Sequence, residues 1–390
     1  MKFTSYFLIA AVFTGLLFAA CSGDESSSQS QDSTAPDIET PVDNDPSGDG
    51  SSDLSIPGIV RNITSMELVE EMGVGWNLGN SLDVTSADKT DWGNPLPSQQ
   101  IIDRVFDMGF RTLRVPVTWG FHQQSAAPFT IDATYLTQVQ ETVNYGISKG
   151  MHVIINIHHD ETWLRPTAAD APQVNPRVAS LWTQVATRFQ AYGDHLIFET
   201  FNELRLLNSP EEWIGGTQEG RDVLNQYHAT ALNAIRATGG NNSTRHLLMG
   251  TYAASTLPVA MDGLIIPNND SRVIISLHSY FPWPFAGPDE TLAEWGSDED
   301  KALLEQEFDR IHQKWIVEEN RPVILGEWGA VDKENLSVRE AYYDFYVSES
   351  TERGLLPIVW DDGGYFRMLN RATLTWHFPT LAETIVAAEN

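Results

Sequence analysis

The sequence predicts an α/β fold, a single (β/α)8 TIM barrel that follows a disordered N-terminal tether. From residue 57 onward, short apolar and β-branched runs alternate with longer amphipathic segments, which is typical of parallel strands joined by crossover helices. Eight such units fit into the roughly 330 residues that remain. Polar side chains follow most of the predicted strands, and in this fold the C-terminal strand ends carry the active site.

Residues 1–20 are predicted to be an export signal of the lipoprotein type. Lys2 precedes an apolar run, and small residues then lead to Cys21, the only cysteine of the chain. The apolar run is too short for a comfortable transmembrane helix. The segment "FAAC" resembles a bacterial lipobox, which predicts lipidation of Cys21 and an outer-membrane lipoprotein of a Gram-negative bacterium. The alternative is ordinary cleavage near Ala20 and secretion.

Residues 21–56 are predicted to be a disordered linker. They are rich in Ser, Asp, Pro and Gly, with nine acidic residues and no basic one. Such a segment buries too little apolar surface to offset the entropy of ordering. We therefore expect the catalytic domain to span residues 57–390.

Composition limits the partners of this domain. Hydrophobic residues make up 42% of the chain, enough for a large core, and the formal net charge is −29. So negative a chain is unsuited to nucleic acid or to an anionic membrane surface. An uncharged polymer is compatible with it. We expect a monomer that meets a membrane only through its lipid anchor.

The predicted strands are taken in chain order from the apolar runs. They cover residues 74–78, 112–116, 153–158, 196–201, 247–251, 273–278, 323–327 and 357–360. Predicted helices between them cover residues 97–108, 132–149, 174–192, 217–237, 300–317 and 336–352.

Polar residues gather where six of these strands end. Alternation along the third strand places Asn156 and His158 on one face and His159 on the other. Glu199 lies deeper than Glu203 on the fourth strand, and we expect it to pair with a buried basic side chain. The residues at the six ends are Arg114, His158, His159, Asp160, Asn202, Glu203, His278, Tyr280, Glu327 and Trp360.

Two of these residues, Glu203 and Glu327, suggest glycoside hydrolysis. Strands four and seven face each other across a barrel, and a retaining glycosidase needs two carboxylates roughly 5–5.5 Å apart. Arg114 beside one glutamate would hold it ionised, as a nucleophile requires. The other glutamate must keep its proton and is expected in a less positive environment.

The motifs together resemble glycoside hydrolase family 5, and most closely its subfamily 4. They are "GWNLGNSLD", "WGNP", "GFRTLRVPVTW", "VIINIHHD", "IFETFNE", "HSYFPWPFA", "GEWGA" and "PIVWDDGG", in collinear order from about Val74 to Asp362. The resemblance implies that Glu203 is the acid/base and Glu327 the nucleophile. It also implies supporting roles for Arg114, His158, Asn202, His278 and Tyr280. Where the family has "NEP", this chain reads "NEL", with Leu204 in place of proline.

Several aromatic and polar residues are expected to bind sugar rings. By its place at the eighth strand end, Trp360 is predicted to form the floor beneath the reactive sugar. Trp76, Trp92, Trp163 and His159 are candidates for outer positions, and Asn77 resembles a sugar-binding amide of the family. Other tryptophans are assigned to the core (Trp182, Trp315 and Trp376) or stay open (Trp283, with Phe285).

Two other functions compete with this interpretation. A metal-dependent barrel hydrolase is suggested by "HHDE" at residues 158–161 together with His278. However, adjacent His158 and His159 cannot both point inward from one strand, so we expect no metal and no other cofactor. A non-catalytic, lipid-anchored glycan-binding protein usually lacks one catalytic glutamate, and both are present here.

The predicted reaction is therefore retaining endo-β-1,4-glucan hydrolysis within a plant cell-wall polysaccharide. The resemblance admits cellulose, mixed-linkage glucan, xyloglucan and xylan backbones. We favour xyloglucan, because the loops after the first, third and sixth strands suit a broad groove. Cellulase or mixed-linkage glucanase activity on undecorated glucan is the alternative.

Overall fold

The computed structural model describes residues 54–288 and 290–389. The predicted signal, Cys21 and most of the predicted linker lie outside the described residues. Leu54 and Ile56 fall in the predicted linker, yet they contact the folded body. The Asn144 side chain donates to the Leu54 carbonyl oxygen at 2.7 Å, and Ile56 packs against the core. The ordered body thus begins no later than residue 54.

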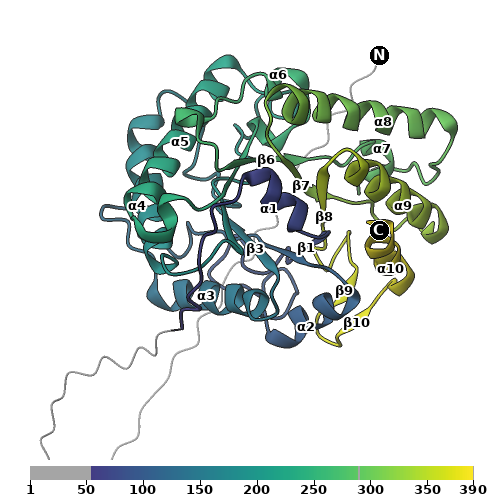
Figure 1. The fold of residues 1–390 in the computed structure, drawn as a ribbon, viewed down its shortest axis with the longest axis horizontal. Coiled ribbons are helices and arrows are strands. Elements are labelled where there is room, and N and C mark those ends of the chain that lie inside the picture. Colours follow the sequence, from purple (N-terminus) through teal and green to yellow (C-terminus); the bar gives the residue numbers. More distant parts are fainter. Residues whose placement is uncertain (1–53, 289, 390) are drawn as a thin grey trace, which may run out of the picture. The chain divides into compact units, whose positions relative to one another are not determined.

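The centre of the fold is a closed barrel of eight parallel strands in sequence order, as predicted (Figure 1). Each strand pairs with the next along the chain, and β1 closes the barrel against β8. The strands are β1 (Gly75–Asn77), β2 (Thr112–Val115), β3 (His152–Asn156), β4 (Leu196–Glu199), β5 (Leu247–Gly250), β6 (Val273–His278), β7 (Val323–Trp328) and β8 (Leu355–Val359).

Helices surround the barrel (Figure 1). Polar caps explain where several of them begin, since the side chains of Ser98, Asp132 and Thr217 each accept a backbone N–H of the first turn. The long helices are α2 (Gln99–Met108), α3 (Ala133–Ile147), α4 (Ala171–Arg188), α5 (Gln218–Ala237), α8 (Asp298–His312), α9 (Leu336–Glu352) and α10 (Pro379–Ala388). A π-helical turn, η4 (Gln313–Glu318), extends α8.

The connection between β5 and β6 contains only short helical pieces. They are η2 (Tyr252–Ala254), α6 (Pro258–Met261) and η3 (Pro267–Asn269), and a 3-10 turn, η1 (Gly240–Ser243), lies before β5. The loop after β6 carries α7 (Trp283–Ala286), and a small hairpin of β9 (Leu369–Asn370) and β10 (Thr375–Trp376) follows β8.

One end of the barrel interior is filled by a short helix, α1 (Ser65–Glu71), which precedes β1 and lies at the centre of the ring in Figure 1. Its Leu68 and Val69 pack against one inward side chain or more from each of β3 to β8. These are Ile154, Ile197, Leu248, Ile274, Ile324, Leu356 and Ile358. This apolar layer closes the N-terminal end and leaves the other end for polar groups.

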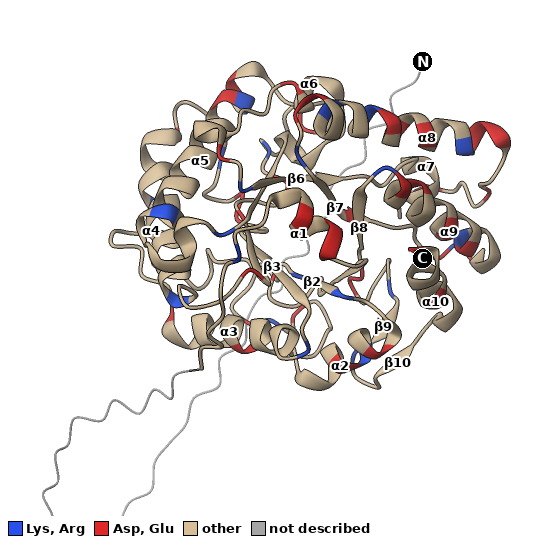
Figure 2. Ribbon diagram, viewed as in Figure 1, with Lys and Arg blue, Asp and Glu red and all other residues tan. Residues whose placement is uncertain are grey.

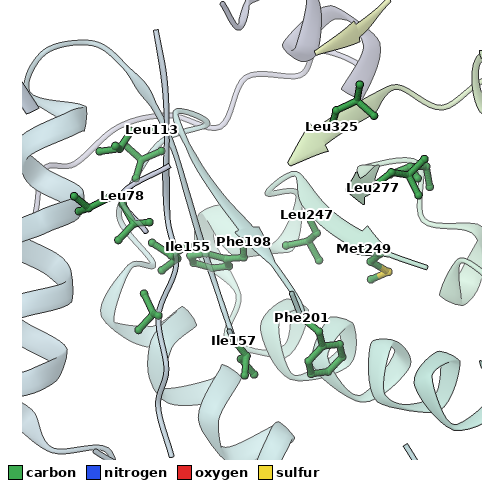
Figure 3. Close-up of a cluster of buried hydrophobic side chains, with 14 of the residues drawn as sticks. Leu78, Leu113, Ile155, Ile157, Phe198, Phe201, Leu247, Met249, Leu277 and Leu325 are labelled. Atoms are coloured by element: carbon green, nitrogen blue, oxygen red, sulfur yellow. The ribbon is translucent and has the colours of Figure 1, made fainter. Parts of the chain in front are cut away.

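The larger core lies between the barrel and the helices. Figure 3 shows part of it, with Leu113, Ile155 and Phe198 projecting from neighbouring strands. Trp182 and Trp315 are buried in this core, as predicted. Trp376 packs its ring against Phe110 with centroids 6.1 Å apart, also in agreement.

Strands three and four end earlier than predicted, at Asn156 and Glu199. His158 and Glu203 therefore lie in loops, where the alternation of a strand no longer applies. Glu327 is in β7, but a register shift between Leu325 and Trp328 interrupts the ladder there. Because Ile324 points inward, regular alternation would turn Glu327 outward, and the irregularity turns it into the barrel.

The charge on the described part is spread over the helical exterior. Figure 2 shows acidic positions, in red, on α1 and along α8, among fewer basic ones. Within residues 54–288 and 290–389, no helix has the length and apolar character needed to cross a membrane.

Candidate active site

A cavity of about 640 Å³ lies at the C-terminal ends of the strands. Its wall combines carboxylates, imidazoles and aromatic rings, which suits a neutral polar ligand with apolar faces. The lining residues are His158, His159, Asn202, Glu203, Trp213, Ala253, Ser255, Thr256, His278, Tyr280, Trp283, Pro288, Glu327, Trp360 and Phe366. Eight of the ten residues predicted at strand ends are among them.

Arg114, fully buried beneath the cavity, organises the polar groups. Its guanidinium donates to Glu199 at 2.8 Å, to Glu327 at 2.7 Å and to the Asn202 side-chain oxygen at 2.7 Å. Burial lowers the pKa of Arg114, but the charges of Glu199 and Glu327 outweigh burial and raise this pKa above its ordinary value. The prediction that Glu199 pairs with a buried basic side chain is confirmed.

Glu327 lies between two hydrogen-bond donors. Arg114 bonds to Oε1, and the Tyr280 hydroxyl donates to Oε2 at 3.0 Å. Burial and the charges of Glu327 and Glu203 raise the pKa of the Tyr280 hydroxyl well above its ordinary value, so Tyr280 remains a donor. A guanidinium on one side and a hydroxyl on the other hold the two oxygens of this carboxyl group in place, as a nucleophile requires.

Glu203 has a different environment, with His278 as its hydrogen-bond partner. The His278 Nδ1 lies 2.8 Å from Glu203 Oε1, and the Arg205 guanidinium lies 3.6 Å from Oε2. Burial raises the pKa of Glu203, but the hydrogen bond and charge of His278 and the charges of Arg205 and His159 outweigh it and lower this pKa. The expected less positive environment is therefore not found around the free carboxylate.

The two carboxylates are close enough to act on one bond. Single oxygens of Glu203 and Glu327 and a ring nitrogen of His278 lie within 4.8 Å of one another. That distance leaves no room for a water between the two glutamates and a sugar, so it matches retention and not inversion.

Trp360 and His158 lie beside this pair. Their rings are nearly parallel, at 3°, with centroids 5.9 Å apart. Burial and the charges of His159 and Arg114 lower the pKa of His158 well below its ordinary value, so this imidazole is neutral. Trp360 is 8% exposed and lines the cavity, as a floor for a sugar ring requires.

The position of His159 differs from the one predicted from alternation along the third strand. Both His158 and His159 line the cavity, although adjacent positions were expected to point to opposite sides. The reason is that β3 ends at Asn156, so both imidazoles belong to a loop. Asn156 and His158 do share a face, with 3.2 Å between the amide nitrogen and Nδ1.

Two predicted sugar contacts, Asn77 and Trp76, are wrong in this structure. Asn77 is fully buried and binds Arg114 with its oxygen, while its nitrogen donates to the Gly326 carbonyl. Trp76 is also fully buried, with its indole N–H on Asp361. Trp163 is half-buried and is not among the residues that line the cavity; its N–H donates to the side chain of Asp160 and its ring packs on Arg177. Its contact with an outer sugar stays a prediction.

Two aromatic residues complete the cavity wall. Trp283, left open by the sequence, is 48% exposed and lines the cavity, whereas Phe285 is buried. Trp213 was missed, and it is 56% exposed. It stands in the long loop that follows Glu203 and has no strand or helix pattern, so the only signal in the sequence was a tryptophan shortly after the predicted acid/base.

A possible metal-ligand group occurs next to the site. Ligand atoms of Asp83, His158 and His159 lie within 4.8 Å of one another. The Asp83 oxygens already accept two backbone N–H groups, and His158 Nδ1 is bonded to Asn156. These donors are committed to the protein's own hydrogen bonds, and they fit a metal poorly.

Comparison with known proteins identifies the family. The model of the cellulase family, glycosyl hydrolase family 5, matches residues 75–365. The chain belongs to glycoside hydrolase family 5. It is a glycoside hydrolase, and the likeness to subfamily 4 is confirmed by solved structures.

Curated relatives of this family 5 member include Endoglucanase B of Clostridium cellulovorans, which is 46% identical over 84% of this chain and 76% of its own length. Endoglucanase A of Ruminococcus albus is 41% identical over 86% of this chain and 95% of its own. The structure of ZgEngAGH5_4 in complex with a cellotriose is 49% identical, with a TM-score of 0.83 over 84% of this chain and 100% of the other. A GH5-4 broad specificity endoglucanase from Clostridium acetobutylicum is 44% identical, with a TM-score of 0.81 over 83% and 100%.

Proposed function

We propose that this glycoside hydrolase is a retaining endo-β-1,4-glucanase that cleaves internal backbone linkages of a plant cell-wall β-glucan. The observation that carries the proposal is the pair of carboxylates, Glu203 and Glu327, with oxygens within 4.8 Å. The names of the relatives as endoglucanases support the choice of bond and of internal cleavage.

In the first step the Glu327 carboxylate attacks the anomeric carbon while Glu203 gives its proton to the departing glycosidic oxygen. A covalent glycosyl–Glu327 ester forms, and the leaving-group sugar departs with a free hydroxyl. In the second step Glu203 takes a proton from water, the hydroxyl displaces Glu327, and the product keeps the original anomeric configuration. Asn202, held by Arg114, is placed to donate to a sugar hydroxyl next to the reacting carbon.

Xyloglucan is the substrate we propose among the β-glucans. Branches at the 6-position of the glucose units need space beside the backbone, and one wall of the cavity is built from small side chains: Ala253, Ser255 and Thr256. Correct branches would add contacts that stabilise the transition state, so they should raise turnover.

The test is to measure kcat/KM on xyloglucan and on carboxymethyl cellulose with one enzyme preparation, and to follow the anomer formed by NMR. We expect retention, early loss of polymer length and higher kcat/KM on xyloglucan. Preference for undecorated glucan would reject the xyloglucan assignment only. Inversion would reject the mechanism, and absence of new reducing ends would favour the non-catalytic glycan-binding alternative. Unchanged activity in EDTA is expected, and its loss would favour the metal-dependent alternative.

We further propose that the chain is exported and anchored by a lipid on Cys21. The support is the lipobox-like "FAAC" before the only cysteine. Replacing Cys21→Ala should move the protein from the membrane fraction to the soluble fraction at equal specific activity. An unchanged distribution would instead favour ordinary secretion.

A further inference from the structure

Arg205, two residues after Glu203, occupies a position that the reaction as described does not use. Its side chain is 12% exposed and faces three carboxylates. Its Nε donates to Glu212 at 3.1 Å and its Nη1 to Glu161 at 3.4 Å. One arginine among three acidic groups is unlike an isolated surface ion pair, and it lies directly behind the acid/base.

The contacts of Arg205 with Glu203 differ in kind. Nη1 donates to the backbone carbonyl of Glu203 at 2.9 Å, whereas the nearest carboxylate oxygen is 3.6 Å away, beyond hydrogen-bond distance. Arg205 therefore fixes the main chain that carries the acid/base and acts on its carboxylate only through charge. The carboxyl group stays free to give and take a proton.

The same guanidinium supports an exposed aromatic ring. Its carbon lies 4.3 Å from the centroid of the Trp213 ring. Trp213 is 56% exposed and lines the cavity, so one face rests on the cation while the ring remains accessible. Glu212, which precedes Trp213, is bound to the same arginine and also accepts the Asn208 backbone N–H at 2.7 Å.

The order of the strands indicates on which side of the reacting sugar Trp213 lies. Trp360 and Glu327 belong to the neighbouring strand ends of β7 and β8, and the reacting sugar lies there. Glu203 must reach the oxygen on the opposite side of that sugar. Trp213 is in the same loop as Glu203 and is joined to it through Arg205, so we assign it to the leaving-group side.

We propose that Arg205 is a positioning residue that joins the acid/base Glu203 to Trp213, and that Trp213 is a stacking platform for the leaving-group sugar. This inference rests on the proposed function. The apolar face of a β-linked glucose unit packs on the indole, and the shared arginine sets that unit's glycosidic oxygen against the Glu203 carboxyl.

The charge of Arg205 gives this role a pH signature. The titratable and charged groups that face Glu203 come from four loops or strand ends: Arg205, His159, His278, Tyr280 and Glu327. Removing Arg205 takes away one of the cations that favour the ionised carboxylate. The pKa of Glu203 then rises, and the basic limb of kcat/KM moves to higher pH.

The experiment compares two substrates, cellohexaose and an aryl cellobioside with a poor phenol leaving group, which places no sugar on the leaving-group side. Trp213→Ala should lower kcat/KM on cellohexaose about tenfold more than on the aryl cellobioside. Arg205→Lys keeps the charge but not the flat face, so it should reproduce this selective loss without moving the basic limb. Arg205→Gln should show the selective loss and also the shifted limb.

Two matched controls separate these effects from general disturbance. Ile214→Ala removes the exposed neighbour of Trp213 that does not line the cavity, and Arg353→Gln removes an arginine paired with two carboxylates far from the site. Both should behave as wild type on both substrates, and thermal melting of every variant checks folding.

If Trp213→Ala lowered kcat/KM equally on the two substrates, the proposal that Trp213 is a stacking platform for the leaving-group sugar would be wrong. A basic limb that stays in place in a folded Arg205→Gln variant would overturn the link to Glu203. Failure of the proposed function has a different result, because the wild-type enzyme would then cleave neither substrate.

Discussion

Arg114 Nη1 lies 2.7 Å from Glu327 Oε1, and both side chains are almost inaccessible to solvent. The same guanidinium bonds to Glu199, which is also fully buried. Two buried carboxylates thus depend on one cation. The cost of removing these charges from water is offset only while all three groups are present.

Arg114→Met should therefore destabilise the protein by about 3–5 kcal/mol, because it leaves Glu199 and Glu327 buried without their cation. Urea unfolding monitored by tryptophan fluorescence measures this loss. The double variant Arg114→Met/Glu199→Gln should recover part of it, since one of the two unpaired charges is then absent. If the Arg114→Met variant were as stable as wild type, Arg114 would not be needed to offset the buried charges of Glu199 and Glu327.

Glu327→Ala should abolish detectable turnover on polysaccharide while the variant still binds it. The carboxylate that forms the ester is gone, and the alanine leaves space on that face of the sugar. Added azide should enter this space and yield a glycosyl azide of inverted configuration. NMR of the product gives the anomer. Turnover of the polysaccharide by a well-folded Glu327→Ala variant would exclude this residue as nucleophile.

Glu203→Ala should lower polysaccharide turnover by about 10²- to 10⁴-fold, the usual contribution of a general acid. Substrates with dinitrophenol leaving groups need no proton and should still form the ester. Azide needs no general base, so here it should give a glycosyl azide of retained configuration, the opposite anomer to that from Glu327→Ala. The same anomer from both variants would contradict the two assigned roles.

The barrel and the two glutamates are predictable from sequence because they follow from strong local patterns. Apolar β-branched runs such as residues 273–278 form strands, and Glu327 directly follows such a run. Asn77 and Trp76 were misplaced for a physical reason. A barrel strand is buried on both faces, so a polar or aromatic residue at its end belongs either to the cavity or to the network below it.

Trp213 and Arg205 illustrate what sequence patterns leave out. Both belong to the loop between Glu203 and α5, where no periodicity relates position to direction. Only the fold shows that the arginine turns back to the Glu203 carbonyl and that the tryptophan rests on it. Leu204, which stands where the family motif has proline, does not indicate this arrangement, because its side chain is buried and carries no polar group.

The electrostatics of Glu203 predict different pH limits for free and glucan-bound enzyme. In the free enzyme its pKa is lowered, because His278, Arg205 and His159 outweigh the effect of burial. The acid form is needed for the first step, so kcat/KM should fall as pH rises through this lowered pKa. An uncharged glucan in the cavity displaces water and disfavours the carboxylate, which raises the pKa of Glu203 again.

The basic limb of kcat should therefore lie at higher pH than the basic limb of kcat/KM, because kcat reports the bound enzyme and kcat/KM the free enzyme. Initial rates on cellohexaose between pH 3 and 9 give both profiles, with the dinitrophenyl cellobioside as control because its first step needs no proton. For that control, the fall of kcat/KM at high pH should no longer occur at the pKa of Glu203. If kcat and kcat/KM on cellohexaose fell at the same pH, the bound sugar would leave the pKa of Glu203 unchanged. If kcat/KM on the dinitrophenyl cellobioside fell at that pH as well, the titrating group would not be Glu203.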